Sequence, residues 1–147
     1  MISTTIPAPT IRLAGALRVA VGRLRRQLRD IADSDHLTPS QMSVLSRLEK
    51  DGAACASSLA AAERVRPQSM AATLTVLEQR GLIRRDPDPE DGRRQLIALT
   101  PAAREWVRGN RRAREEWLAR ALQERYTDAE RRTIGEALAL LDRLTSL

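Results

Sequence analysis

Residues 81–100 read Gly-Leu-Ile-Arg-Arg-Asp-Pro-Asp-Pro-Glu-Asp-Gly-Arg-Arg-Gln-Leu-Ile-Ala-Leu-Thr, which is two short apolar runs separated by an acidic turn. Two prolines and an Asp-Gly pair make a tip that cannot be helical, so the stretch predicts a β-hairpin. Arg93 and Arg94 follow the tip directly. The hairpin should therefore hold a narrow basic tip away from the rest of the chain.

A helix is expected immediately before the hairpin. Pro67 suits a first helical position, and Gly81 suits the position just after a helix. Between them, Met70, Leu74 and Leu77 recur at three- and four-residue steps and predict one buried face. A capped helix followed by a basic hairpin is typical of a winged helix-turn-helix, so the chain is expected to bind DNA.

Further helices are predicted on both sides of this unit. Thr38 and Gln41 can form a capping box that opens a helix ending at Gly52, and Thr127 can form another with Glu130. The remaining helices are expected at about 11–31, 57–64 and 101–122, after a loose arm at residues 1–9. The expected fold class is therefore mainly α with a small β-hairpin wing (α+β), a winged helix-turn-helix with long terminal helices.

The composition indicates a single domain over residues 1–147, in which dimerisation helices at 10–34 and 101–147 flank a DNA-binding lobe at 36–100. A net charge of +6 favours a polyanionic partner. One cysteine cannot form an internal disulfide. The sequence has neither a secretion signal nor an apolar run of about 18 residues, so a cytoplasmic protein without a membrane span is expected.

The order and spacing of these motifs resemble the MarR family of bacterial transcription regulators, over about residues 11–147. The motifs are Leu37-Thr-Pro-Ser-Gln41, Leu59-Ala60, Leu77-Glu-Gln-Arg-Gly-Leu-Ile83, Asp91-Gly-Arg93 and Leu99-Thr100. The resemblance implies a homodimer that binds a pseudo-palindromic operator, most commonly as a repressor. It also implies that the fourth helix enters the major groove and that a wing arginine enters the minor groove.

The resemblance further implies which side chains meet DNA. The expected DNA-binding residues are Arg66, Gln68, Ser69, Thr73, Arg85, Arg93 and Arg94. Arg93 corresponds to the wing arginine, with Asp91 bracing the turn, although the sequence leaves open which arginine enters the minor groove. Two features, the Ala71-Ala72 pair and Glu90, depart from the family pattern. Ala71-Ala72 cannot hydrogen-bond a guanine, and Glu90 is expected to pair with Arg93 or Arg94.

The first and last helices carry aliphatic stripes that the central lobe does not need for its own core. Being far apart in sequence, they can bury these stripes only against each other or against a second chain. A homodimer is therefore expected, and a six-helix monomer is the alternative. The expected dimerisation residues are Leu17, Leu24, Ile134, Leu138, Leu141 and Leu144.

A small, possibly phenolic effector is expected in a cleft that in the family lies between the DNA lobe and the terminal helices. Arg23 on the first helix can hold a carboxylate, and Trp106 or Trp117 can form a wall for an aromatic ring such as that of salicylate. His36 can line the same cleft. The alternatives are ordinary packing of both tryptophans, a histidine without a role, and a regulator that needs no ligand.

Other functions have less support in the sequence. It contains no phosphate-binding glycine loop, nucleophile motif, acid–base pair or metal-ligand spacing, so no enzyme, cofactor or metal is expected. Cys55 precedes the third helix, whose N-terminus can lower a thiol pKa, but a small half-buried residue is the simpler interpretation. A protein that coats the chromosome without sequence preference is an alternative to a regulator, and the sequence does not distinguish repression from activation.

Overall fold

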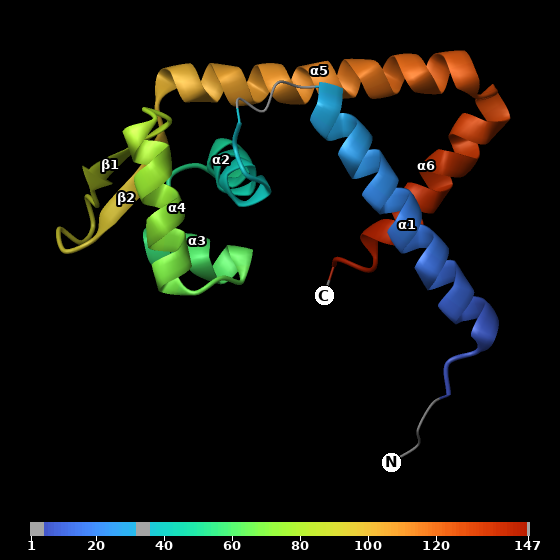
Figure 1. The fold of residues 1–147 in the computed structure, drawn as a ribbon, viewed down its shortest axis with the longest axis horizontal. Coiled ribbons are helices and arrows are strands. Elements are labelled where there is room, and N and C mark those ends of the chain that lie inside the picture. Colours follow the sequence, from blue (N-terminus) through green and yellow to red (C-terminus); the bar gives the residue numbers. More distant parts are fainter. Residues whose placement is uncertain (1–4, 32–35, 147) are drawn as a thin grey trace.

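The computed structural model describes residues 5–31 and 36–146, and in these ranges the chain forms six helices and one two-stranded sheet (Figure 1). The elements are α1 (Ala8–Ile31), α2 (Pro39–Asp51), α3 (Ala56–Glu63), α4 (Pro67–Gln79), β1 (Ile83–Pro87), β2 (Gln95–Leu99), α5 (Pro101–Arg125) and α6 (Asp128–Asp142). The expected fold class is confirmed, because a mainly helical chain carries one antiparallel hairpin.

Two helices begin at the capping residues that the sequence indicates. Thr38 Oγ1 accepts a hydrogen bond from the Gln41 backbone N–H at 3.2 Å, and Gln41 Oε1 accepts one from the Thr38 N–H at 3.0 Å. Thr127 and Glu130 form the same reciprocal pair at α6. Each pair satisfies backbone donors that a helix start leaves free. Both predicted capping boxes are confirmed.

The end of α4 is a Schellman turn at Gly81. The Gly81 N–H donates to the Glu78 carbonyl at 2.9 Å, and the Leu82 N–H donates to the Leu77 carbonyl at 3.0 Å. Gly81 has a φ of +70°, a conformation that strains a residue with a Cβ but does not strain glycine. This turn leads the chain directly from the helix into β1.

The terminal helices differ from the prediction at their ends. α1 begins at Ala8, inside the expected loose arm, because a proline in the first turn of a helix needs no N–H partner. α5 continues past Leu122 to Arg125, since no helix breaker occurs before the N-cap of α6. Residues 1–4 of the expected arm and 32–34 of the expected first helix lie outside the described residues.

The hydrophobic core lies in the lobe formed by α2 to β2 and the first turns of α5. Its fully buried side chains are Val44, Leu45, Leu59, Met70, Leu74, Leu77 and Ile97. The predicted inner face of α4 is therefore confirmed. Ala54 and Ile97 exchange two backbone hydrogen bonds, of 2.8 and 3.1 Å, which attach the loop before α3 to the edge of the hairpin.

α5 is a long strut that connects the lobe to the terminal helices (Figure 1). The lobe gathers at the start of α5, α1 packs against α5, and α6 turns away from its far end. Neither α1 nor α6 contains a buried residue. None of the described helices is both long and apolar enough to cross a membrane.

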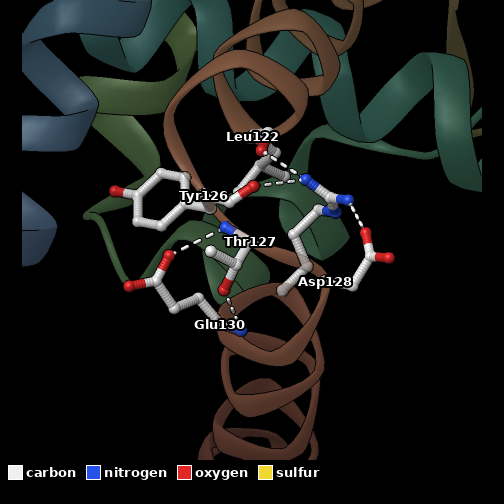
Figure 2. A network of polar contacts seen from close by, with 6 residues as sticks. Leu122, Tyr126, Thr127, Asp128 and Glu130 are labelled. Carbon is white, nitrogen blue, oxygen red and sulfur yellow. Dashed lines mark hydrogen bonds and ion pairs between the residues drawn. The ribbon is translucent and has the colours of Figure 1, made fainter.

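The corner between α5 and α6 is fixed by Arg131 (Figure 2). Its guanidinium donates hydrogen bonds to the carbonyls of Leu122 and Tyr126 and pairs with Asp128. Carbonyls in the last turn of a helix have no partner within that helix. Arg131 therefore satisfies the end of α5 from the start of α6, which sets the direction in which α6 leaves.

Candidate nucleic-acid interface

α4 turns its three buried residues inward and its polar residues outward. Arg66, the N-cap residue, is exposed, and so are Gln68 and Ser69 in the first turn. The free N–H groups of a helix start favour an anion such as a phosphate. Thr73 differs from these three, because it is half-buried and its hydroxyl donates to the Ser69 carbonyl at 3.1 Å. Its donor is used by its own helix, which leaves Thr73 only an acceptor for a base.

The wing is a regular antiparallel hairpin with a tied tip. β1 and β2 pair in register from Ile83 opposite Leu99 to Pro87 opposite Gln95. Asp91 holds the tip in two ways. Its Oδ1 accepts from the Arg93 N–H at 3.1 Å, and its carbonyl accepts from the Arg94 N–H at 2.9 Å. Both arginines therefore leave the tip from fixed backbone positions.

The structure distinguishes the wing arginines by their partners. The Arg94 guanidinium lies 3.8 Å from the Asp91 carboxylate, and the Arg85 guanidinium lies 2.6 Å from the Glu78 carboxylate. Arg93 is exposed and forms no ion pair with any residue that the structure describes. Arg93 therefore keeps its whole guanidinium for a ligand, whereas Arg85 is held against the end of α4.

The expected pairing of Glu90 with a wing arginine is not observed. The ion pair of Arg94 is with Asp91, because the turn brings these two residues together at i and i+3. Glu90 is exposed, and its backbone N–H donates to Asp88 Oδ1 at 2.9 Å. The Glu90 carboxylate thus adds a negative charge to the tip without neutralising Arg93.

Net charge is distributed unevenly along the chain. Residues 36–100 contain nine lysines and arginines against eight acids, so the lobe is nearly neutral. α1 contains six arginines and one aspartate. Most of the chain's net charge of +6 therefore lies on α1 rather than on the winged lobe. Because the lobe is nearly neutral in total, a basic surface on it can arise only from the positions of its arginines.

Cys55 is the N-cap residue of α3 and borders a hollow of about 430 Å³ beneath the wing, which Arg93 and Arg94 also line. Its Sγ lies 3.2 Å from Ser57 Oγ and 3.0 Å from Ser58 Oγ. These hydrogen bonds, first that of Ser57 and then that of Ser58, lower the pKa of the thiol to about 7. A thiol with this pKa is partly ionised at neutral pH.

Glu49 joins the lobe to the strut. Its side chain, only 7% exposed, accepts from Arg108 Nε at 3.1 Å and from Arg111 Nη1 at 2.6 Å. The hydrogen bond from Arg108 is the main reason that the pKa of Glu49 lies below its ordinary value. One carboxylate shared by two guanidiniums fixes α2 against α5. Nothing in the sequence marks these residues as partners, since such arginines resemble a solvated helix face.

A second pocket lies between α1, α2 and α5, with a volume of about 380 Å³. Its polar lining consists of Arg25 and Arg29 of α1, Arg114 of α5, and Ser43 and Ser46 of α2. We call it the arginine pocket. It lies between the lobe and the helices outside it, where the sequence analysis expects an effector cleft.

None of the four residues expected to line an effector cleft, Arg23, His36, Trp106 and Trp117, lines this pocket. Arg23 precedes Arg25 by two residues, so it projects from a different side of α1. His36 is exposed. Trp106 packs against the lobe core, which agrees with the alternative of ordinary packing. Trp117 is half-buried farther along α5. An effector cleft lined by those four residues stays a prediction, separate from the arginine pocket.

Comparisons with known proteins agree with this geometry. The sequence profile of the MarR family matches residues 37–94. An uncharacterised HTH-type transcriptional regulator of Mycobacterium bovis is 44% identical over 111 residues, which are 76% of this chain and 78% of that protein. A crystal structure from Pseudomonas aeruginosa, assigned as a transcriptional regulator, is 38% identical with a TM-score of 0.86, covering 97% of this chain and 99% of that one.

A MarR family protein of Bacillus stearothermophilus shares the fold alone. Its structure has a TM-score of 0.83 at 21% identity, over 97% of this chain and 100% of that one. The similarity thus extends beyond the lobe to the terminal helices.

Proposed function

This chain belongs to the MarR family of DNA-binding transcription regulators, and from that premise we propose that it is a homodimeric repressor. It binds a pseudo-palindromic operator and leaves it when a small effector binds. The main observation in support of DNA binding is Arg93, which is exposed, forms no ion pair among the described residues and stands at a tip that Asp91 holds. An arginine held in this way suits insertion into a narrow minor groove.

The start of α4 supports contact with the major groove. Arg66, Gln68 and Ser69 are exposed there, and Gln68 has the amide that can pair with adenine in a bidentate way. Arg94, Arg85 and Thr73 are weaker candidates, since each already has a partner within the chain. These three contribute orientation or phosphate contacts more than base readout.

Exposed leucines on the terminal helices support the dimer. Leu24 of α1 is 45% exposed, and Leu138 and Leu144 of α6 are 57% and 65% exposed. Leu17 of the same α1, and Ile134 and Leu141 of the same α6, are half-buried. Several large apolar side chains left exposed on two helices suit an interface better than a solvated face. A second copy with two-fold symmetry covers them, and the two recognition helices then read half-sites about 10 base pairs apart.

Footprinting of the full-length protein on host genomic fragments tests this function. We expect protection of a discrete inverted repeat, at a stoichiometry of two chains per repeat. Continuous protection without sequence preference would instead identify a chromosome-coating protein, which the nearly neutral lobe disfavours.

Transcription in vitro from the protected promoter separates a repressor from an activator. We expect fewer transcripts with increasing protein. A rise in transcription would show that the regulator is an activator. An operator affinity that no small molecule changes would show that the regulator is ligand-independent.

A further inference from the structure

The arginine pocket is an anion site by its charges. Arg25, Arg29 and Arg114 line it, and no carboxylate of the described residues is among its lining side chains. Arg25 and Arg29 stand at i and i+4 on α1, where like charges repel each other and destabilise the helix. An anion between them removes that repulsion.

The three arginines have donors to spare. Arg25 and Arg29 are exposed and form no ion pair within the part of the chain that the structure describes. Arg114 Nε donates to the Leu28 carbonyl at 3.2 Å, which orients the guanidinium and leaves its terminal N–H groups available. Ser46 of α2 adds a hydroxyl to the lining, whereas the Ser43 hydroxyl already donates to Glu63. Several charged donors that converge in this way suit more than one carboxylate or phosphate group.

The apolar part of the pocket is aliphatic. Leu28, Leu37, Pro39 and Met42 line it, and among the described residues no aromatic ring belongs to the lining. A volume of about 380 Å³ is at the small end of the range for ligand pockets. The occupant therefore has a compact carbon frame without a required stacking partner.

We propose that the arginine pocket binds a small organic anion with two or more negative groups on an aliphatic frame. The regulatory role of this site rests on the proposed function. The ligand class assigned to it is an aliphatic polyanion instead of a phenolic acid. The excess positive charge of α1, six arginines against one aspartate, is the second observation behind it.

The pocket also connects to the helix-turn-helix. Ser43 lines the pocket, and its hydroxyl donates to Glu63 Oε2 at 2.8 Å at the end of α3. Arg47 Nε donates to the other oxygen of Glu63 at 2.8 Å. An anion that draws the Ser43 hydroxyl into the pocket competes with its hydrogen bond to Glu63. Anion binding and the position of α3 that fits DNA are then coupled, because the anion binds more tightly when that hydrogen bond is broken.

Calorimetry on the full-length protein without DNA tests the assignment independently of any operator. The probes are butyrate, glutarate and tricarballylate at constant ionic strength, with inorganic pyrophosphate as a phosphate probe and salicylate as the phenolic one. We expect affinity to rise about tenfold or more with each added carboxylate, because each gains a charge-assisted hydrogen bond. Pyrophosphate binding as tightly as tricarballylate would support the anion site and show that charge matters more than the carbon frame.

Matched variants assign the binding to this pocket. We expect Arg29→Gln to weaken tricarballylate by about tenfold or more, and Arg18→Gln, which removes the same charge from α1 outside the pocket, to leave it unchanged. Equal losses in both variants would overturn the assignment in favour of diffuse attraction. Absence of binding by every polyanion, or salicylate binding more tightly than tricarballylate, would also overturn it. A missing operator footprint would refute the regulator and leave these titrations unaffected.

Discussion

The lobe and the terminal helices are both striped with aliphatic residues, yet they use these stripes differently. The fourteen buried hydrophobic residues of the described ranges run from Leu37 to Val107, in the lobe and the first turns of α5. α1 and α6 have none. The lobe thus completes its core within one chain, whereas α1 and α6 leave large apolar side chains exposed. An apolar period predicts a buried face without saying whose atoms bury it.

The largest expected effect comes from the lobe core. Leu74 is 0% exposed, so we expect Leu74→Ala to lower the free energy of unfolding by about 2–5 kcal/mol through lost contacts and a cavity. Urea denaturation measures it. The control Val65→Ala, at a residue 39% exposed, should change it by less than about 1 kcal/mol. Equal losses from the two would mean that the lobe has no core distinct from its surface.

The next effect concerns the terminal helices. We expect Leu138→Glu to raise the dimer dissociation constant at least about a hundredfold, roughly 3 kcal/mol, because it puts a charge in an apolar interface. Light scattering across a dilution series gives the mass. Arg132→Gln on the same helix is the control and should leave the dimer intact. A wild-type monomer at micromolar concentration would contradict the assignment of α6 to an interface.

A smaller effect tests the tip of the wing. Arg93→Ala should weaken operator binding by about 1–3 kcal/mol, the range of one good specific contact. Mobility-shift titration at fixed salt measures it, and Arg132→Ala removes the same charge far from the wing. We expect Arg94→Ala to cost less than Arg93→Ala, because Asp91 already holds Arg94 at 3.8 Å. The reverse order would transfer the minor-groove role to Arg94.

The smallest effect concerns the ionisation of the Cys55 thiol in the lobe. With a pKa of about 7, lowered from 9.0, the Cys55 thiolate forms as pH rises through 7. Iodoacetamide labelling followed by mass spectrometry should therefore reach half its maximal rate near pH 7. Ser57→Ala should move this midpoint upward, and so should urea, which removes both serine hydrogen bonds. A midpoint near 9 in the folded protein would show that these bonds do not hold the thiolate.

Local features of this fold could be predicted from the sequence. Thr38 with Gln41, and Thr127 with Glu130, act within one helical turn. Gly81 ends α4 because glycine alone adopts a positive φ without strain. Such signals depend on neighbours in the chain, so the sequence carries them directly.

Features that depend on tertiary packing could not be predicted in this way. Glu49 and Arg111 are 62 residues apart, and nothing in either segment marks the other as its partner. The arginine pocket needs the relative rotation of α1 and α5, which decides that Arg25 lines it and Arg23 does not.

The clamp at Glu49 makes α5 a lever. From Arg111 to its end at Arg125, α5 extends about 21 Å at the rise of an α-helix. A tilt of about 10° at the clamp carries that far end through about 4 Å, slightly more than the spacing of one base pair along a DNA strand, about 3.4 Å. With the far ends joined in a dimer, the same tilt swings the lobes instead. For the proposed dimer, we expect a tilt of this size to shift α4 relative to its half-site without disturbing the core of the lobe.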